Sequence, residues 1–382
     1  MPDPAISPAQ VAMLVQGSEV YGIGTIEKLY AESWPEMTFI CLGPGPMFDW
    51  LRGRGARVEL VEGLVSLREK SSLATLCKMP LVFQRAKRDA QRIDALVRGR
   101  GVRVIHAQWR PQQIIAGYMR RLSYRSVWQI NNNMSRQRLA GLGVKLNHRL
   151  ARWGADLLLP ASDFIAANWE GCGVPIRTIR NAAVPLFAEP NEVPLKGPLR
   201  TLTAGRLEAS KGHHVAVDAV IAARQVGCDA TLDMYGGPVD GNPYADELKR
   251  KIEAAGVGAA IQFMGFRDDL RTRQREYHLG LQCRLDPEPC SLWVCETLVD
   301  GLPLLASATG GTPELVEEGV TGLLYPPGAA DVLARQLVEL GRDRRRLAAM
   351  RPAAFERGRR QFTVERFLRE TLAAYESLDR AN

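Results

Sequence analysis

Short apolar runs alternate with segments of helical periodicity along most of the chain. Val11–Val15 and Val102–Ile105 are continuous apolar runs of strand length. Val82–Val97 instead carries apolar residues three or four positions apart, with Arg and Lys on its other faces. Buried strands that alternate with helices are typical of parallel sheets covered on both faces. The pattern therefore predicts an α/β protein.

The predicted elements fall into two series, separated by a proline-spaced segment without periodicity. The first series of strands is Val11–Val15, Thr38–Leu42, Val58–Val61, Val102–Ile105, Ser126–Ile130 and Asp156–Leu159. The second is Thr201–Ala204, Ala230–Tyr235, Ile261–Met264, Leu279–Cys283 and Leu302–Ala306. The expected helices include Thr25–Ser33, Val82–Val97, Gly212–Gln225, Asp246–Ala255, Ser291–Asp300 and Phe362–Leu378. We expect two Rossmann-like domains, residues 1–185 and 200–361, joined by a linker at 186–199.

Length and composition agree with two globular domains. The chain has 382 residues, of which 46% are apolar and 24% charged. This composition excludes a disordered, collagen-like or disulfide-framework protein. The seven cysteines form no C-x-x-C pair, so we do not expect a zinc site. We expect them to be the reduced thiols of a cytoplasmic protein. Neither a signal peptide nor a membrane-spanning run is predicted.

The chain has a formal net charge of +8, and its charged residues are distributed unevenly along the sequence. Residues 1–190 carry 25 Lys and Arg against 15 Asp and Glu, whereas residues 191–382 carry 25 against 27. No acidic residue lies between Asp94 and Asp156, and Arg98–Arg152 supplies twelve basic ones. Such a stretch indicates an anionic partner, which could be phosphate, a membrane surface or nucleic acid.

Two motifs that follow predicted strands carry candidate chemistry. Gly205-Arg206 and Lys211-Gly212 place two cations between a strand and a helix, a pairing suited to a diphosphate. Glu288 and Glu296 flank a helix start that Ser291 can cap. Two carboxylates so placed could hold two different hydroxyl-bearing rings. Each motif alone could equally be a solvated surface feature.

Together with Gly310-Gly311-Thr312-Pro313-Glu314 and Gly319–Leu323, these motifs resemble the retaining GT-B glycosyltransferases of family 4, also called glycosyl transferases group 1. That family shows G-R-x4-K-G, then E-x7-E, then G-G-x-P-E. The resemblance implies two Rossmann-like domains facing across a cleft, with the C-terminal helix, 362–380, packing back on the first. It also implies a role in bacterial polysaccharide or glycolipid synthesis.

The resemblance implies roles for individual residues. Arg206 and Lys211 match the cations that bind the donor diphosphate and stabilise the leaving group. Glu288 matches the glutamate that contacts the transferred sugar, Glu296 the one that holds the ribose hydroxyls, and His106 a histidine near the reacting sugar. The remaining donor-side matches are Gly22, Gly24, Gly265, Phe266, Ser291 and Leu292.

This chain also departs from the family pattern. Glu288-Pro289-Cys290-Ser291 replaces the usual E-G-F-G, and proline removes one backbone donor. Gln108 stands where the family has a second histidine. Asn131 begins an asparagine run at a place where many members of the family have a further histidine. We therefore expect Gln108 and Asn131 on the acceptor side. His106 has two open interpretations, a catalytic group and a structural histidine at a strand end.

The resulting expectation is transfer of a hexose from a nucleoside-diphosphate sugar with retention, without a metal or other cofactor. The acceptor would be a glycan, a lipid-linked glycan or a small molecule. A sugar-nucleotide epimerase of the same architecture is an alternative, although E-x7-E with G-G-x-P-E speaks against it. A nicotinamide dehydrogenase fails because Gly22–Glu27 lacks the third glycine and Gly43–Pro46 does not open a helix as the fingerprint requires.

A basic nucleic-acid-binding protein is the third alternative. Trp109, Tyr118, Tyr124 and Trp128 interleave the basic stretch, as single-strand binding would need, but no nucleic-acid module surrounds them. We do not expect a nucleic-acid partner. The basic stretch is instead expected to handle the acceptor, with peripheral association at the inner face of the membrane.

Overall fold

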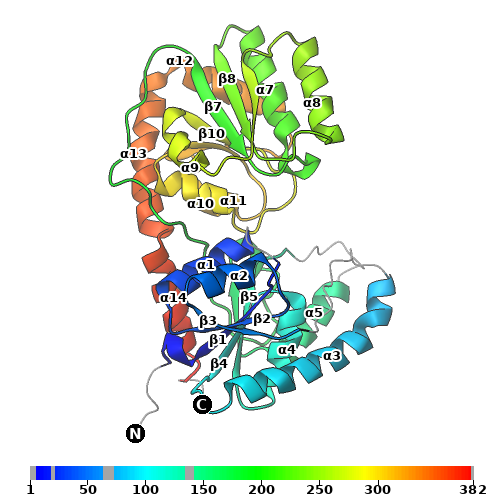
Figure 1. Ribbon diagram of the computed structural model, residues 1–382. Coiled ribbons are helices and arrows are strands. Elements are labelled where there is room, and N and C mark those ends of the chain that lie inside the picture. The colour runs from blue at the N-terminus through cyan, green and yellow to red at the C-terminus, as the bar shows by residue number, and fades with distance from the viewer. Residues whose placement is uncertain (1–5, 19–21, 63–72, 134–141, 380–382) are drawn as a thin grey trace. The chain divides into compact units, whose positions relative to one another are not determined.

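A computed structural model describes residues 6–18, 22–62, 73–133 and 142–379. The chain forms two compact units, residues 1–180 with 367–382, and residues 181–366. Each unit contains one six-stranded sheet, and the paired strands are parallel (Figure 1). The predicted α/β fold with two Rossmann-like parallel sheets is confirmed.

The first unit has the strand order β3-β2-β1-β4-β5-β6. Its strands are β1 (Val11–Val15), β2 (Thr38–Cys41), β3 (Arg57–Leu60), β4 (Val104–Ala107), β5 (Arg125–Ile130) and β6 (Leu157–Pro160). Its helices are α1 (Ile23–Ser33), α2 (Pro46–Gly53), α3 (Leu73–Val97), α4 (Arg110–Arg120), α5 (Leu142–Gly154) and α6 (Asp163–Ala166). Most of α14 (Val364–Glu376) also belongs to this unit.

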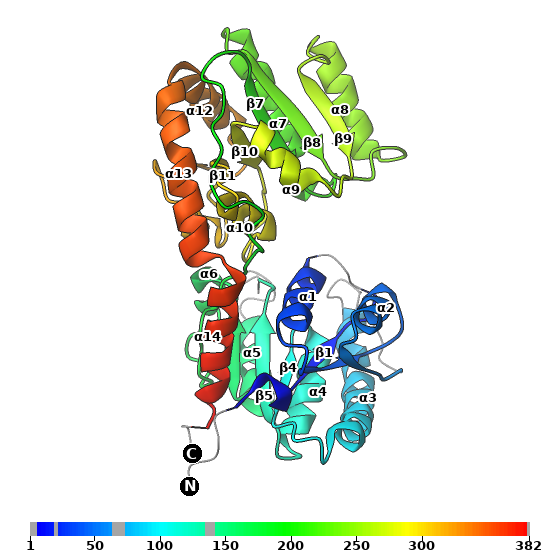
Figure 2. The ribbon, with the colours of Figure 1, turned by 60° about the vertical axis from the view of Figure 1, so that its left-hand side comes forward.

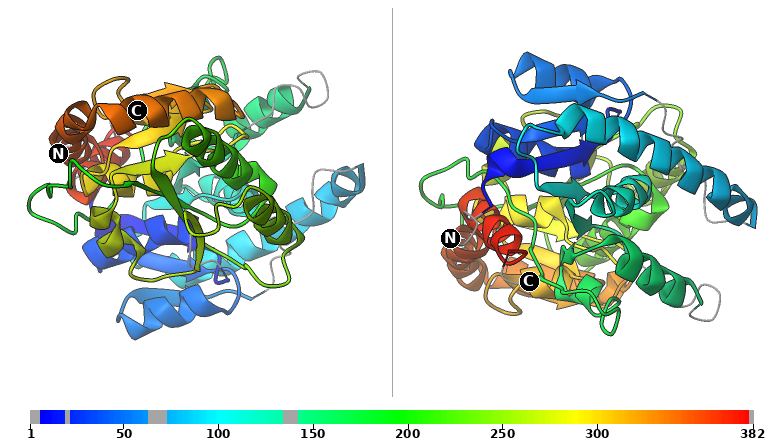
Figure 3. Two further views of the ribbon diagram at one scale, coloured as in Figure 1. Left: turned by 90° about the horizontal axis from the view of Figure 1, so that it is seen from above. Right: turned by 90° about the horizontal axis from the view of Figure 1, so that it is seen from below.

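The apolar stripe of α3 is buried in the core of the first unit. Val82, Ala86, Ala90, Ile93 and Val97 lie in one cluster with residues of the sheet and of α4. The right-hand view of Figure 3 shows α3 alongside α4. This stripe therefore faces its own unit rather than a membrane.

The opposite face of the same sheet carries the aromatic contacts of α14. Successive residues of a strand point to opposite faces. Ile105 and Ala107 thus join the α3 side, while His106 faces Tyr30 of α1 and Tyr375 of α14. Figure 2 shows α14 along this unit.

The second unit has the strand order β12-β11-β10-β7-β8-β9. Its strands are β7 (Leu199–Ala204), β8 (Ala230–Tyr235), β9 (Ile261–Gly265), β10 (Leu279–Gln282), β11 (Leu304–Ser307) and β12 (Gly322–Tyr325). Its helices are α7 (His213–Gln225), α8 (Pro243–Ala254), α9 (Leu270–Arg273), α10 (Leu292–Val299), α11 (Thr312–Leu315), α12 (Ala330–Arg342) and α13 (Arg344–Gln361). Strand β12 was not among the predicted strands.

The segment expected as a linker is bonded to the second unit. Arg275 Nη2 donates to the Glu189 carbonyl over 3.1 Å, and Arg344 Nη2 to the Gly197 carbonyl over 2.9 Å. The units divide at 180/181 and 366/367, whereas the sequence interpretation divided them at 185/186 and 361/362.

Three local details differ from the sequence analysis. Strand β4 begins at Val104 and ends at Ala107, two residues later than expected. Helix α1 begins at Ile23 rather than Thr25. Gly43–Pro46 does precede a helix, because Gly45 caps α2 and Pro46 begins it. Proline is favoured at a first helical position, where its missing N–H has no helical partner to lose.

Within the described ranges, Cys41, Cys172, Cys228, Cys283, Cys290 and Cys295 are free, and all but Cys228 are buried. Across those same ranges, none of the helices has the length and apolar character needed to cross a membrane.

Candidate functional site

The candidate site of the second unit lies where the strand order reverses. The chain passes from β7 to β8 and β9 on one side, then returns to β10 on the other side of β7. In open parallel sheets, ligands bind beyond the carboxyl ends of the strands at this switch point. The loops after β7 and β10 therefore stand at the expected position.

These two loops are locked together by backbone contacts. Gly212, at φ +72°, lies so close to the end of β10 that a Cβ would overlap the Cys283 carbonyl oxygen. The Leu285 N–H donates to the Ser210 carbonyl over 3.0 Å. Only glycine tolerates both the left-handed backbone and the approach. The loop that carries Lys211 is thus held against the loop that carries Glu288.

The predicted cations and the first predicted glutamate are on these loops. Lys211 Nζ lies 3.6 Å from Glu288 Oε2, and both side chains are largely buried. Burial lowers the pKa of Lys211, while the Glu288 carboxylate acts to raise it. Arg206 is exposed and pairs with Glu208 over 3.2 Å. The structure therefore brings Lys211 and Glu288 together and leaves the Arg206 guanidinium at the surface.

The double glycine that follows β11 supports the backbone of Glu288. Gly310, at φ +60°, is packed so that a Cβ would overlap the Glu288 carbonyl oxygen. The Gly311 N–H donates to that same oxygen over 2.8 Å. The G-G-x-P-E motif thus fixes the position of Glu288 through main-chain contacts.

Helix α10 carries the remaining predicted residues of this loop. Ser291 caps it, because its Oγ accepts from the Val294 N–H over 3.4 Å, and Leu292 is its first residue. Glu296 is half-buried in the second turn. Burial raises the pKa of Glu296, and the Arg271 guanidinium opposes that shift. The helix start and Glu296 are therefore placed as the sequence predicted.

Gly265 is the last residue of the edge strand β9, and Phe266 follows it. Gly265 adopts φ +67°, and its carbonyl accepts from the Gly236 N–H over 2.8 Å. Phe266 is 61% exposed. An exposed aromatic ring beyond a strand end can contact a flat ligand.

In the first unit, the switch point lies between β1 and β4. Gly22 precedes α1 at φ +62°, as expected for a turn glycine. Gly24 is buried in the first turn of the helix rather than in the loop, because α1 begins at Ile23. The glycine-rich turn is therefore shorter than predicted.

Gln108 and Asn131 are brought together at the same edge of this sheet. They follow the adjacent strands β4 and β5, and Asn131 Nδ2 donates to Gln108 Oε1 over 3.0 Å. Gln108 is buried, and its N–H donates to Gln112 Oε1 over 2.9 Å. Gln108 and Asn131 therefore form a hydrogen-bonded pair of side-chain amides at the carboxyl ends of β4 and β5.

His106 lies inside β4 and not after it, which corrects its expected position. It is fully buried, and its Nε2 lies 3.1 Å from Gln129 Oε1, an oxygen that can only accept. Nε2 therefore carries the proton, and Nδ1 accepts from the Tyr375 hydroxyl over 2.5 Å. Burial lowers the pKa of His106 to about 4. This geometry favours the structural interpretation over the catalytic one.

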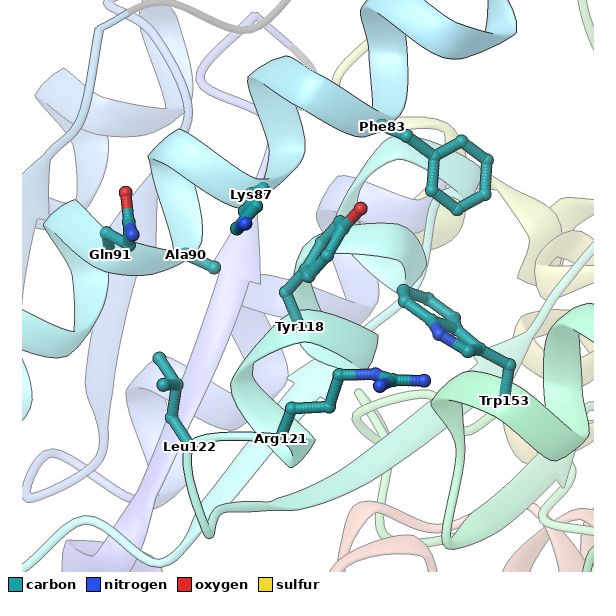
Figure 4. A pocket seen from close by; sticks show the side chains of 8 residues that line it. All are labelled: Phe83, Lys87, Ala90, Gln91, Tyr118, Arg121, Leu122 and Trp153. Carbon is teal, nitrogen blue, oxygen red and sulfur yellow. The ribbon is translucent and has the colours of Figure 1, made fainter.

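The basic stretch of the first unit borders a groove of about 420 Å³ between α3, α4 and α5 (Figure 4). Its lining residues are Phe83, Lys87, Ala90, Gln91, Tyr118, Arg121, Leu122 and Trp153. The Arg121 guanidinium lies 5.3 Å from the centre of the Trp153 ring. Among the described residues, the lining holds the cations Lys87 and Arg121 and no carboxylate, which favours an anionic group.

In the ranges given above, no three His, Cys, Asp or Glu side chains gather as a candidate metal site. Metal independence stays a prediction.

Arg284, two residues after the end of β10, was not among the predicted site residues. Its Nη1 lies 3.0 Å from Glu288 Oε2, the oxygen that Lys211 also approaches. The available signal was its place, because residues just after a central parallel strand stand at the ligand-binding edge.

Comparison with known proteins gives a family match within the second unit. Residues 188–357 match the family model of glycosyl transferases group 1. The chain is 29% identical over 198 residues to the amylovoran biosynthesis glycosyltransferase AmsK of Erwinia amylovora, covering 48% of this chain and 47% of that protein. It is 29% identical over 180 residues to a GDP-mannose-dependent phosphatidylinositol monomannoside mannosyltransferase of Mycobacterium tuberculosis, covering 44% of each. The chain thus spans about half the length of these curated relatives.

Similarity to solved structures extends over nearly the whole chain. Anabaena Alr3699/HepE in complex with UDP superposes with a TM-score of 0.78 at 20% identity, covering 95% of this chain and 99% of that one. The two six-stranded parallel sheets with their helices have the GT-B fold.

Proposed function

We propose that this chain is a retaining glycosyltransferase of family 4 that transfers a hexose from a nucleoside-diphosphate sugar without a metal. One observation carries the proposal: Lys211 and Glu288 meet at the switch point of the unit that matches glycosyl transferases group 1. UDP bound to Alr3699/HepE and the GDP-mannose dependence of the mycobacterial relative support a nucleotide-sugar donor.

The reaction would break the bond between C1 of the sugar and the oxygen of the β-phosphate. The electron pair stays on that oxygen, while C1 forms a new bond to the acceptor oxygen on the same face. The leaving phosphate takes the proton of the acceptor hydroxyl, so no side chain need act as nucleophile. Charge builds on the phosphate during the step, and fixed cations aimed at it give a large catalytic term.

Individual residues take the roles that this chemistry requires. Lys211 and Arg206 would meet the diphosphate, and the first turn of α10 would offer N–H groups to it. Glu288 would accept hydrogen bonds from the transferred sugar, and Glu296 from the ribose. Phe266 would lie beside the nucleobase.

The acceptor side is assigned to the first unit. The amide pair Gln108 and Asn131 would serve a glycan, a lipid-linked glycan or a small acceptor, and the basic groove beside Arg121 would meet an anionic membrane surface. Relatives named for amylovoran and phosphatidylinositol mannoside synthesis support such acceptors. A cytoplasmic enzyme at the inner face of the membrane fits this assignment.

A thermal-shift screen of nucleoside diphosphates and their sugars tests the proposal. A ligand at 100 times its Kd stabilises the folded state by about 2.7 kcal/mol. We expect UDP or GDP and a matching sugar to raise the Tm, and turnover to persist in EDTA. No stabilisation by any nucleotide would overturn the proposal. A product with the inverted anomeric configuration would overturn the retaining mechanism. Release of nucleotide in the absence of an acceptor would indicate a sugar-nucleotide epimerase instead.

A further inference from the structure

The loop after β10 contains a cation with no role in the proposed function so far. Arg284 Nη1 lies 3.0 Å from Glu288 Oε2, and Lys211 Nζ lies 3.6 Å from that same oxygen. The side chains of Arg284 and Glu288 are only 20% and 18% exposed. One half-buried carboxylate oxygen is thus shared by two cations.

Arg284 changes the charge of the interlocked loops. Without it, the largely buried side chains Lys211 and Glu288 would balance each other in charge. With it, these side chains carry a surplus of one positive charge. Asp286 in the same loop is exposed to solvent. The surplus therefore lies beside Glu288, where the transferred sugar is proposed to sit.

The Arg284 guanidinium also has unused hydrogen-bonding capacity. Its Nε is buried and has no hydrogen-bond partner among the described residues. A buried donor without an acceptor costs free energy, and a guanidinium has five donors in a planar fork that matches a carboxylate. The Nε atom itself is enclosed, so a ligand carboxylate would have to meet the guanidinium through the exposed part of the side chain.

Glu288 makes an acidic sugar unfavourable unless a cation stands beside it. A second carboxylate next to Glu288 would be repelled by its charge. Arg284 is bonded to Glu288, so it lies within reach of the ring that Glu288 would contact. Glu288 could accept from sugar hydroxyls while Arg284 donates to a sugar carboxylate.

We infer that Arg284 selects a donor whose transferred sugar carries a carboxylate, a nucleoside-diphosphate uronic acid. This inference rests on the proposed function and deepens it. Arg284 is then a specificity residue that contacts the substrate.

Matched donors with and without the carboxylate test the inference. Binding of UDP, UDP-glucose, UDP-glucuronate, GDP, GDP-mannose and GDP-mannuronate is measured by titration calorimetry. The unaltered chain should bind a uronate at least tenfold more tightly than its neutral partner, since a charged hydrogen bond is worth a factor of that order. Arg284→Gln should abolish that preference and leave the affinity for UDP or GDP within about threefold. Arg335→Gln, an exposed arginine of α12 in the same unit, is the control and should keep the preference.

The outcomes separate the inference from the proposed function. If no nucleotide binds, the proposed function fails and the inference fails with it. If nucleotides bind but the neutral sugar binds as well as the uronate, only the inference is overturned. The same holds if Arg284→Gln keeps the preference. The comparison of donors on the unaltered chain decides the matter even if Arg284→Gln does not fold.

Discussion

Gly310 lies directly against the main chain of Glu288, so that the space a side chain would need is filled by the Glu288 carbonyl group. Gly310 also adopts φ +60°, which disfavours any other residue. The glycine motif and the glutamate motif, 22 residues apart in the sequence, therefore form one structural element.

Gly310→Ala should displace Glu288 and weaken donor binding. The left-handed backbone costs a β-carbon roughly 1–2 kcal/mol, and the overlap with Glu288 forces the loop to move. Gly319→Ala is the matched control, because Gly319 has φ +76° and nothing within 4 Å of a Cβ. We expect both variants to lose stability, but only Gly310→Ala to lose the Tm increase caused by nucleotide. Equal nucleotide responses in the two variants would contradict this coupling.

Lys211→Ala should remove sugar transfer while the protein remains folded. Loss of one preorganised donor to developing charge costs about 100- to 1,000-fold in kcat. Glu288 keeps its ion pair with Arg284, so the loop has a partner for its carboxylate. The measurement is the transfer rate, together with the Tm. Lys249→Ala, on the exposed side of α8, should keep the full rate. Near-normal turnover by Lys211→Ala would overturn the leaving-group assignment.

The main elements and the loop positions of Lys211 and Glu288 could be predicted because both leave local signals. Buried parallel strands are continuous apolar runs, and the motif residues follow those strands directly. His106 could not be placed in the same way. Its environment is made by Tyr375, 269 residues away, and nothing in the local pattern reports that α14 covers β4. Arg284 was missed because a single arginine after a strand has no distinguishing spacing.

Acid should destabilise the fold between about pH 6.5 and pH 4. Burial lowers the pKa of His106, His213 and His278 to about 4 in each case. An unfolded histidine takes up its proton near pH 6.5, so the unfolded state gains protons first as the pH falls. Each histidine should cost about 2 kcal/mol of stability between pH 7 and pH 5. Urea denaturation at the two pH values measures the difference, and unchanged stability would contradict the buried neutral state.

Anionic vesicles should bind the protein at low salt. Lys87 and Arg121 line the groove of the first unit, and each basic residue near an anionic surface contributes about 1 kcal/mol. The double variant Lys87→Gln, Arg121→Gln should therefore lower the partition coefficient by about 30-fold. Co-sedimentation at about 10 mM and 150 mM salt measures it, because screening shortens the range of the attraction. The double variant Lys249→Gln, Arg250→Gln in α8 is the control. Absence of vesicle binding at low salt would overturn peripheral membrane association.

Gly117→Ala should destabilise the first unit although alanine favours helices. Gly117 lies within α4, and its Cα hydrogens face the Trp153 ring so closely that a methyl group would overlap the ring. Alanine gains up to about 1 kcal/mol in helix propensity, whereas overpacking costs typically 1–3 kcal/mol. We expect a net loss of about 1–2 kcal/mol and a change in Trp153 fluorescence, because the groove beside Arg121 must widen. Gly53 lies at the exposed end of α2, and a Cβ there would have nothing within 4 Å. Gly53→Ala should therefore leave the free energy of unfolding unchanged or increase it. Stabilisation by both substitutions would show that Trp153 does not rest on α4.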